Sequence, residues 1–234
     1  MTFLGPNIPV LIDHVTPVAQ VDWERIYGLD PSAVPSQSRT WADLIVNSFG
    51  ATDRSRHYRF SDGAEAILPL FSRHRAAPPF RVYRSPPPAW GFGGLLCSAP
   101  LTRHHVRVVL DDCALLPGAA VQVRPIPLHA ALWEEAAHGT AWKPIARSAH
   151  VIDLSGGFDQ VWETRFPART RSKVRKAAKL GVTVESGTSE ALVEDFDRLF
   201  RTSVARWAHG QNELNWLAAL RAKVRDPKGK FASM

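Results

Sequence analysis

The fold follows most directly from residues 57–70, which read H-Y-R-F-S-D-G-A-E-A-I-L-P-L. Asp62-Gly63 is a dipeptide favoured in tight turns that join two antiparallel strands. Apolar residues lie on both sides of this turn, from Tyr58 to Phe60 and again from Ala66 to Leu70. The pattern therefore predicts a β-hairpin with its turn at Asp62-Gly63.

Two segments in the first half of the chain, one before and one after this hairpin, have apolar residues at helical spacing. Trp41, Leu44, Ile45 and Phe49 fall on one helical face before Gly50, and Val106, Val109, Leu110 and Cys113 recur at the same spacing. We therefore predict helices at 41–49 and 103–115. The other expectations are an extended lead-in over 1–35, an irregular stretch over 72–100, a strand at 121–124 and a short helix around 128–133.

The second half is expected to alternate short strands with helices. Pro167 breaks one helix from the next, and Gly181 is a helix-ending residue. The predicted elements are a strand at 149–154, helices at 158–166 and 170–180, a strand at 182–185, a long helix from Ser189, a last helix at 213–224 and the opening of a strand at 231–232.

The helix predicted at 170–180 lies in a segment with an unusual charge. Seven cations occur between Arg165 and Lys179, and no carboxylate occurs between Glu163 and Glu185. Like charges on neighbouring turns repel one another, so such a helix costs free energy unless an anion compensates. The segment therefore predicts contact with phosphates, although a solvated surface helix is the plainer alternative.

Composition indicates a folded protein with acidic partners. The chain has 234 residues, 45% of them hydrophobic, with eight tryptophans and a net charge of +7. It has no apolar run long enough to span a membrane and no signal peptide, so we expect a cytoplasmic protein. Cys97 and Cys113 are expected to be buried, reduced thiols. No histidine or cysteine spacing is typical of a metal site, and none is predicted.

Several local patterns, in this order along the chain, resemble the twin-lobed acyltransferases of the GNAT superfamily, specifically its FemAB-type branch. Gln37-Ser38 before Trp41 is similar to the family's Q-S-x-x-W opening, and Asp62-Gly63 before Leu68-Pro69 to its D-G … L-P hairpin. Further matches are the glycine-rich loop W-G-F-G-G-L-L at 90–96, the R-x-x-V-R-K-A helix at 171–177 followed by Gly181-Val182, and the helix at 196–206.

The resemblance implies a mixed α/β fold with one GNAT-like lobe over 1–155 and the start of a second over 156–234. It implies transfer of an acyl group from acyl-coenzyme A, or of an aminoacyl group from aminoacyl-tRNA, to an amine. The acceptor would be a small molecule or a cell-wall precursor. A non-catalytic module that binds RNA or another polyanion, or an inactive remnant of such an enzyme, is the alternative.

Site residues follow from the same comparison. Arg171, Arg175 and Lys176 would hold a phosphate or carboxylate of one substrate. Trp41 and the loop with Trp90 and Gly93 would line the acceptor cleft. No general base is indicated. The family's pyrophosphate-binding glycine turn is not found in the sequence, and the resemblance places it beyond Met234.

Overall fold

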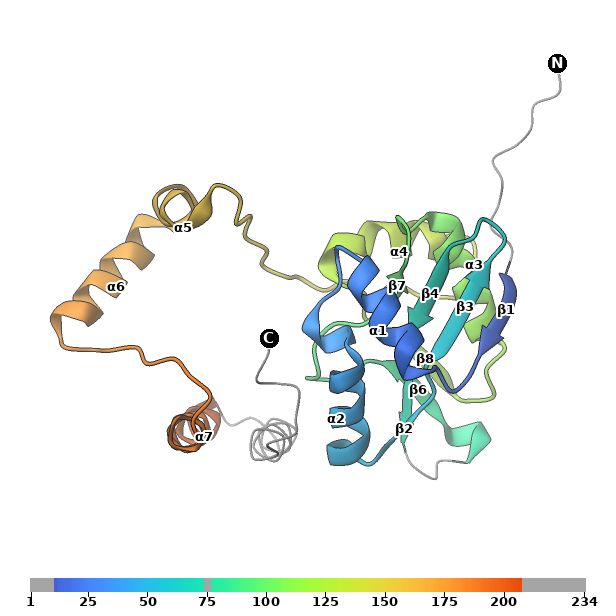
Figure 1. Ribbon diagram of the computed structural model, residues 1–234, viewed down its shortest axis with the longest axis horizontal. Helices are drawn as coiled ribbons and strands as arrows, with labels where there is room; N and C mark the ends of the chain where they lie inside the picture. Colours follow the sequence, from blue (N-terminus) through green and yellow to red (C-terminus); the bar gives the residue numbers. More distant parts are fainter. Residues whose placement is uncertain (1–10, 74–76, 208–234) are drawn as a thin grey trace, which may run out of the picture. The chain divides into compact units, whose positions relative to one another are not determined.

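The computed structural model describes residues 11–73 and 77–207 and has a mixed α/β architecture (Figure 1). The chain divides into two compact units. Unit 1 takes in the described residues up to Pro144 and again from Asp197, and unit 2 comprises Ile145–Phe196. The placement of the lobes on either side of residue 155 stays a prediction. No helix in the described part of the chain is both long and apolar enough to cross a membrane.

Unit 1 is built on two four-stranded sheets. The first has the order β1-β3-β4-β7, with bounds Leu11–Val15, Arg56–Phe60, Glu65–Leu68 and Leu96–Cys97. The second has the order β2-β5-β6-β8, with bounds Ala51–Asp53, Phe71–Arg73, Val82–Ser85 and Ala120–Val123. The chain passes from one sheet to the other twice. It runs from β2 in the second sheet into β3 in the first, and from β4 in the first sheet into β5 in the second.

The predicted hairpin is confirmed as β3 and β4, which pair antiparallel with Arg59 opposite Glu65 and His57 opposite Ile67. Gly63 has a φ of 83°, a conformation that glycine adopts without steric cost. Asp62 Oδ1 accepts a hydrogen bond from the Ala64 amide at 3.0 Å. The two residues of the D-G pair therefore stabilise the turn in different ways.

One strand pair differs from all the others described. β6 and β8 are parallel, with Val82 opposite Ala120 and Ser85 opposite Val123, whereas every other ladder between the strands is antiparallel. Parallel neighbours need a crossover connection, and the segment between β6 and β8 contains the helix α3, Arg103–Ala114. This confirms the helix predicted at 103–115 and the strand predicted at 121–124.

Helices cover both faces of the sheets (Figure 1). On one face α1 (Gln20–Leu29) and α2 (Arg39–Phe49) bury Trp23, Ile26 and Ile45 against Ile67. On the other, α3 and α4 (Ala130–Ala137) pack against a cluster that includes Tyr58, Leu68, Val106, Leu110 and Trp133. Neighbouring residues such as Ile67 and Leu68 lie in different cores, as the alternation of side chains along a strand requires.

Helix ends in unit 1 follow the expected capping chemistry. Ser38 precedes α2 and its hydroxyl accepts a hydrogen bond from the Trp41 amide at 3.2 Å, while Gly50 ends the helix in the left-handed conformation with φ 59°. Thr102 caps α3 by accepting from the His105 amide at 3.3 Å. The helix predicted at 41–49 and the short helix predicted around 128–133 are confirmed by α2 and α4.

Unit 2 consists of short helical elements joined by extended chain. They are α5 (Gly157–Gln160), the π-helix η4 (Val161–Arg165) and α6 (Ala168–Lys179), followed by the first part of α7 (Glu190–Trp207). The predicted helices at 158–166 and 170–180 and the long helix from Ser189 are thus confirmed. Gly181, which follows α6, has a φ of 77°.

Four sequence-based predictions are wrong. The supposed lead-in over 1–35 contains β1 and α1, and Trp23 and Ile26 of α1 are fully buried. The stretch over 72–100 contains β5, β6, β7 and the 3-10 helix η2, Pro78–Phe80. No strand forms at 149–154 or 182–185, where Val151 and Val184 are 65% and 94% exposed. The predictions for 213–224 and 231–232 lie outside the described residues.

Candidate functional site

Two of the motifs quoted from the sequence meet in the structure. Ser36 Oγ donates a hydrogen bond to the Phe92 carbonyl at 2.7 Å and accepts one from the Phe92 amide at 3.1 Å. Gln37 Nε2 donates to the Gly93 carbonyl at 3.0 Å, and Trp41 Nε1 donates to the Trp90 carbonyl at 2.9 Å. We call these two segments, 36–41 and 90–94, the loop clasp.

The glycines of the loop clasp are explained by close backbone packing. A Cβ on Gly93 would lie 2.5 Å from Ser85 Oγ and 2.7 Å from the Ser85 carbonyl carbon. Gly91 has a φ of 93°, and a Cβ there would lie 2.6 Å from the Ser36 Cβ. Gly93 was predicted from the sequence to line a substrate cleft. In the structure its lack of a side chain permits contact between the loop and β6.

The loop clasp adjoins the carboxyl ends of the parallel strands β6 and β8. The Arg124 amide donates to the Ser85 carbonyl at 2.9 Å, and the Gly93 amide donates to the Arg124 carbonyl at 2.7 Å. Ser85 Oγ accepts a further bond from the Gly94 amide at 3.2 Å. The carboxyl ends of parallel strands are the part of an α/β sheet where ligands most often bind. This end of unit 1 is therefore the candidate site on the sheet.

The two tryptophans of the predicted site lie together but differ in exposure. Their rings are 6.2 Å apart and nearly perpendicular, at 75°. Trp41 is half-buried, whereas Trp90 is 0% exposed and belongs to the core between α2 and the sheet. Trp90 therefore supports the loop from inside, and of these two rings only Trp41 has surface that a solute can reach in this conformation.

Arg171 in α6 has a structural role that the sequence did not reveal. Its Nη1 lies within hydrogen-bonding distance of three carbonyl oxygens, those of Trp162 at 3.3 Å, Glu163 at 2.6 Å and Phe166 at 2.8 Å. These carbonyls belong to the end of the π-helix η4 and the residue after it, which the helix itself leaves without donors. Arg171 caps that end through Nη1, and its assignment as an anion-binding residue stays a prediction.

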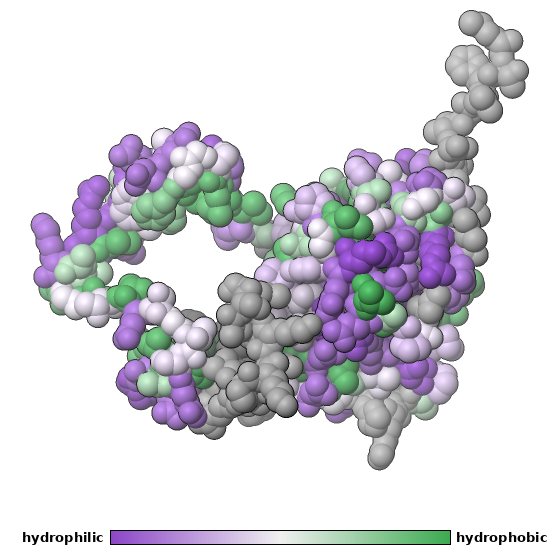
Figure 2. Space-filling view, viewed as in Figure 1, coloured by the Kyte–Doolittle hydropathy of each residue, from purple (hydrophilic) through white to green (hydrophobic). Residues whose placement is uncertain are grey.

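Arg175 and Lys176 are placed differently. Both are exposed on α6, as are Arg169, Lys173 and Lys179, and none of these five has an ion-pair partner among the described residues. Figure 2 shows hydrophilic surface along one side of this helix and hydrophobic surface along the other. The cations of α6 outside the Arg171 cap are therefore not neutralised by carboxylates of the described chain. The loop clasp belongs to unit 1 and α6 to unit 2.

A network of charged groups between α1 and the hairpin has no signature in the sequence. His57, which is 1% exposed, has its Nε2 2.7 Å from Glu65 Oε2. Arg25 Nη2 lies 2.9 Å from Glu65 Oε1 and 3.2 Å from Asp22 Oδ1. The hydrogen bond from Arg25, with a further one from His57, lowers the pKa of Glu65 below its usual value. Asp22, His57 and Glu65 offer ligand atoms within 4.8 Å of one another, but Arg25 already supplies the positive charge between the two carboxylates.

A second network links β3 to α3. Arg56 Nε lies 2.7 Å from Asp112 Oδ2, and Tyr58 Oη donates to the same carboxylate at 2.9 Å. Burial raises the pKa of Tyr58, and burial raises the pKa of the Cys113 thiol to about 12. Asp112 is therefore a half-buried ion-pair partner, whereas its neighbour Asp111 is exposed. Cys97 and Cys113 are both buried free thiols, as predicted.

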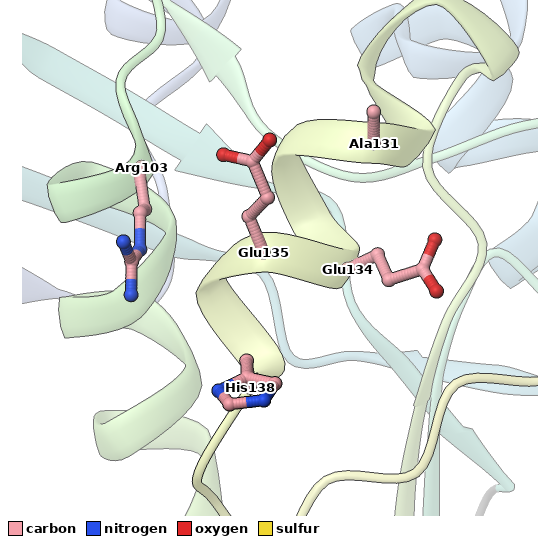
Figure 3. Close-up of a pocket in the computed structure, with 5 residues that line it drawn as sticks. All are labelled: Arg103, Ala131, Glu134, Glu135 and His138. Atoms are coloured by element: carbon pink, nitrogen blue, oxygen red, sulfur yellow. The ribbon is translucent and has the colours of Figure 1, made fainter.

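An open cavity of about 410 Å³ lies between the start of α3 and α4 (Figure 3). Arg103 lines it from α3, and Ala131, Glu134, Glu135 and His138 line it from α4 and the residue after it. Glu134 and Glu135 point to different sides of α4, as adjacent helical residues must. The two carboxylates therefore do not form a paired acid and base.

Comparisons with known proteins identify no relative: no family model matches the chain, and neither a curated protein nor a solved structure does.

Proposed function

We propose that this protein transfers an acyl or aminoacyl group to an amine, in the manner of the GNAT-superfamily enzymes of FemAB type that its sequence resembles. The observation that carries the proposal is the loop clasp. The Q-S-x-x-W segment and the W-G-F-G-G segment were matched to that family independently, and Gln37 bonds directly to Gly93. The resemblance therefore rests on two segments that belong to one structural feature.

The order of elements in unit 1 also supports the proposal. The helix, the hairpin, a second helix and a strand follow one another as the resemblance implies, and the last strand forms the parallel pair beside the loop clasp. A GNAT-like lobe in unit 1, and the start of a second lobe after it, are accordingly part of the proposed function.

Acyl transfer to an amine requires few catalytic side chains from the protein. An amine attacks the carbonyl of a thioester or ester, a proton leaves the nitrogen, and a tetrahedral oxyanion forms and collapses. The protein has to align the two substrates and stabilise that oxyanion with hydrogen-bond donors. The donor would be acyl-coenzyme A or aminoacyl-tRNA, and the acceptor a small amine or a cell-wall precursor in the cytoplasm.

Within this proposal the exposed cations of α6 hold the phosphates of one substrate. Arg175 and Lys176 are the two residues retained from the sequence-based site, because both are exposed and have no carboxylate partner among the described residues. Trp41 contributes the accessible aromatic surface at the clasp. Arg171 takes part by holding the helix that carries the cations.

Mass spectrometry on the purified full chain tests the proposal. The chain is incubated with isotope-labelled acetyl-coenzyme A or with labelled aminoacyl-tRNA, together with a mixture of amine acceptors that includes amino acids, short peptides and a nucleotide-linked muropeptide. We expect a labelled amide that requires both the protein and one of the donors. Absence of any protein-dependent amide with either donor contradicts the proposal.

A second function, binding of RNA without catalysis, is favoured by one specific observation in unit 2. Phe158, Trp162 and Phe166 form a ladder of rings 5.9 Å and 5.6 Å apart, and Phe158 is 72% exposed. Accessible rings in the same unit as unpaired cations are typical of surfaces that bind single-stranded nucleic acid. Such binding would weaken steeply with salt and would need no acyl donor.

A further inference from the structure

Two polar side chains, those of Arg84 and Gln122, lie together on one face of the parallel pair. Arg84 in β6 is directly opposite Gln122 in β8, so their side chains point to the same face. Arg124 is two residues beyond Gln122 and follows the same alternation, and its backbone remains bonded to Ser85 of β6. By this alternation each strand contributes one arginine to the face near its carboxyl end.

This face carries the α2 helix and the loop clasp. Phe71, which is opposite Arg84 on the other side of β6, packs in the core that contains Leu44, Ile45 and Trp90. Gln122 is exposed, while Arg84 and Arg124 are half-buried. Helix packing therefore covers the face at β5 and leaves it open to solvent at β8, beside the clasp.

Gln122 orients the Arg84 side chain. Arg84 Nε donates a hydrogen bond to Gln122 Oε1 at 3.0 Å. This bond uses one of the five N–H donors of the guanidinium and leaves the four on its two terminal nitrogens. A guanidinium held in this way presents a planar, charged fork, which matches the two oxygens of a carboxylate or phosphate.

Neither arginine has its charge matched inside the described part of the protein. Several other arginines of unit 1, though not all, have carboxylate partners: Arg25 pairs with Glu65, Arg39 with Asp43 and Asp53, Arg56 with Asp112 and Arg107 with Asp111. No carboxylate of the described residues lies within ion-pairing distance of Arg84 or Arg124. Two half-buried cations on one face therefore lack an anion.

We propose that Arg84 and Arg124, with Gln122 as the residue that orients Arg84, form a binding site for an oxyanion group of a substrate, either a carboxylate or a phosphate. The assignment rests on the proposed function for the identity of that substrate, but the binding itself does not depend on transfer. The site adds an anion-binding position in unit 1 to the cations of α6, and sequence motifs gave no indication of it.

Nuclear magnetic resonance titration of the full chain tests this site. Pyrophosphate and citrate serve as separate probes, and the Nε–Hε resonances of the arginines report which side chains respond. We expect the Arg84 and Arg124 resonances to shift saturably with at least one probe, and the probe that binds more tightly distinguishes a phosphate site from a carboxylate site. No saturable shift of either resonance with either probe overturns the proposal.

Matched variants separate a local site from the general positive charge. Arg84→Ala and Arg124→Ala are each expected to weaken binding by about tenfold or more, because each removes charge-assisted hydrogen bonds. Gln122→Ala is expected to weaken it less, and Arg103→Ala, which removes an equal charge from α3, to change it by less than about twofold. Equal losses in Arg84→Ala, Arg124→Ala and Arg103→Ala would overturn the proposal.

The outcome is independent of the transfer assay. Binding that depends on Arg84 and Arg124 in a protein that forms no amide supports the anion site and contradicts the proposed function. If the protein forms an amide but Arg84→Ala and Arg124→Ala bind the probes as tightly as the wild type, the proposed function is supported and the anion site is contradicted.

Discussion

The side chain of Gln37 donates a hydrogen bond to the carbonyl oxygen of Gly93 at 3.0 Å, inside the protein, where Gln37 is 1% exposed. The Oε1 atom of the same amide accepts a bond from the Val34 amide at 3.2 Å. One glutamine therefore joins the start of α2 to the loop that closes the parallel pair. The geometry of this end of unit 1 depends on it.

Replacement of Gln37 by alanine should destabilise unit 1 by roughly 1–3 kcal/mol, because the buried Gly93 carbonyl and the half-buried Val34 amide lose their partner. Urea unfolding at neutral pH measures the change. Gln20→Ala is the matched control, since Gln20 is exposed and its amide bonds only to Glu24. Equal midpoints for the two variants would mean that the clasp contributes nothing to stability.

Gly93→Ala should destabilise the protein by about 2 kcal/mol or more, because overpacking against backbone forces the chain to move. The added Cβ would meet the Ser85 backbone carbonyl oxygen at 2.7 Å. Gly28→Ala is the control, because a Cβ in α1 meets nothing within 4 Å there. It should leave stability unchanged or raise it by up to about 1 kcal/mol, as alanine favours the helix. A urea midpoint for Gly93→Ala equal to that of the wild type would contradict the close packing of Gly93 against the Ser85 backbone.

Arg171→Ala should loosen the helical part of unit 2, because three carbonyl oxygens lose a charged donor. Hydrogen exchange of residues 157–180 measures this, and we expect amide protection there to fall by about tenfold. Arg175→Ala removes an equal charge from an exposed position and should leave protection unchanged. If the two variants exchange alike, Arg171 does not cap the π-helix.

Acidification should destabilise unit 1 partly through Glu65. Its pKa is lower in the folded protein than its usual value near 4.5, mainly because Arg25 donates a hydrogen bond to it. A lowered folded pKa contributes stability that is present above the unfolded value and is lost as the pH falls through the folded pKa. Arg25→Ala should therefore lose less stability than the wild type between neutral pH and pH values below 4.5.

Urea unfolding across that pH range measures the effect. Arg107→Ala is the control, because Arg107 pairs with Asp111 on α3 and leaves Glu65 unchanged. It should follow the wild-type pH profile. Identical profiles for Arg25→Ala and the wild type would contradict the role given to Arg25.

The sequence predicted correctly those helices and turns whose conformation is set by residues that are neighbours along the chain. The Asp62-Gly63 turn and the apolar spacing before Gly50 are confirmed because turn geometry and helical periodicity are set by neighbouring residues. The strands β5 and β6 were missed because they are short and surrounded by prolines, and pairing with distant strands stabilises them. Helix α1 was missed because Trp23 and Ile26 provide only a narrow apolar face.

The candidate site was predicted in part for a similar reason. Motifs located Trp41, Trp90 and Gly93, and the structure brings them together. The sequence did not indicate which of them face the interior, because burial of Trp90 depends on where α2 packs. Charge counting likewise located α6 but did not distinguish Arg171, whose partners are backbone carbonyls, from Arg175 and Lys176.

We propose that exposed cations of α6 hold an anionic substrate for acyl transfer. The most direct test measures kcat and KM of amide formation for the wild type and for Arg175→Ala/Lys176→Ala. Arg103→Ala, which removes one positive charge from unit 1, is the comparison variant. We predict a KM at least about tenfold higher for one substrate in the double variant, with kcat within about threefold, because the cations bind that substrate before and during reaction alike. A double variant with the KM values of the wild type, or a wild type that forms no donor-dependent amide, would contradict the account.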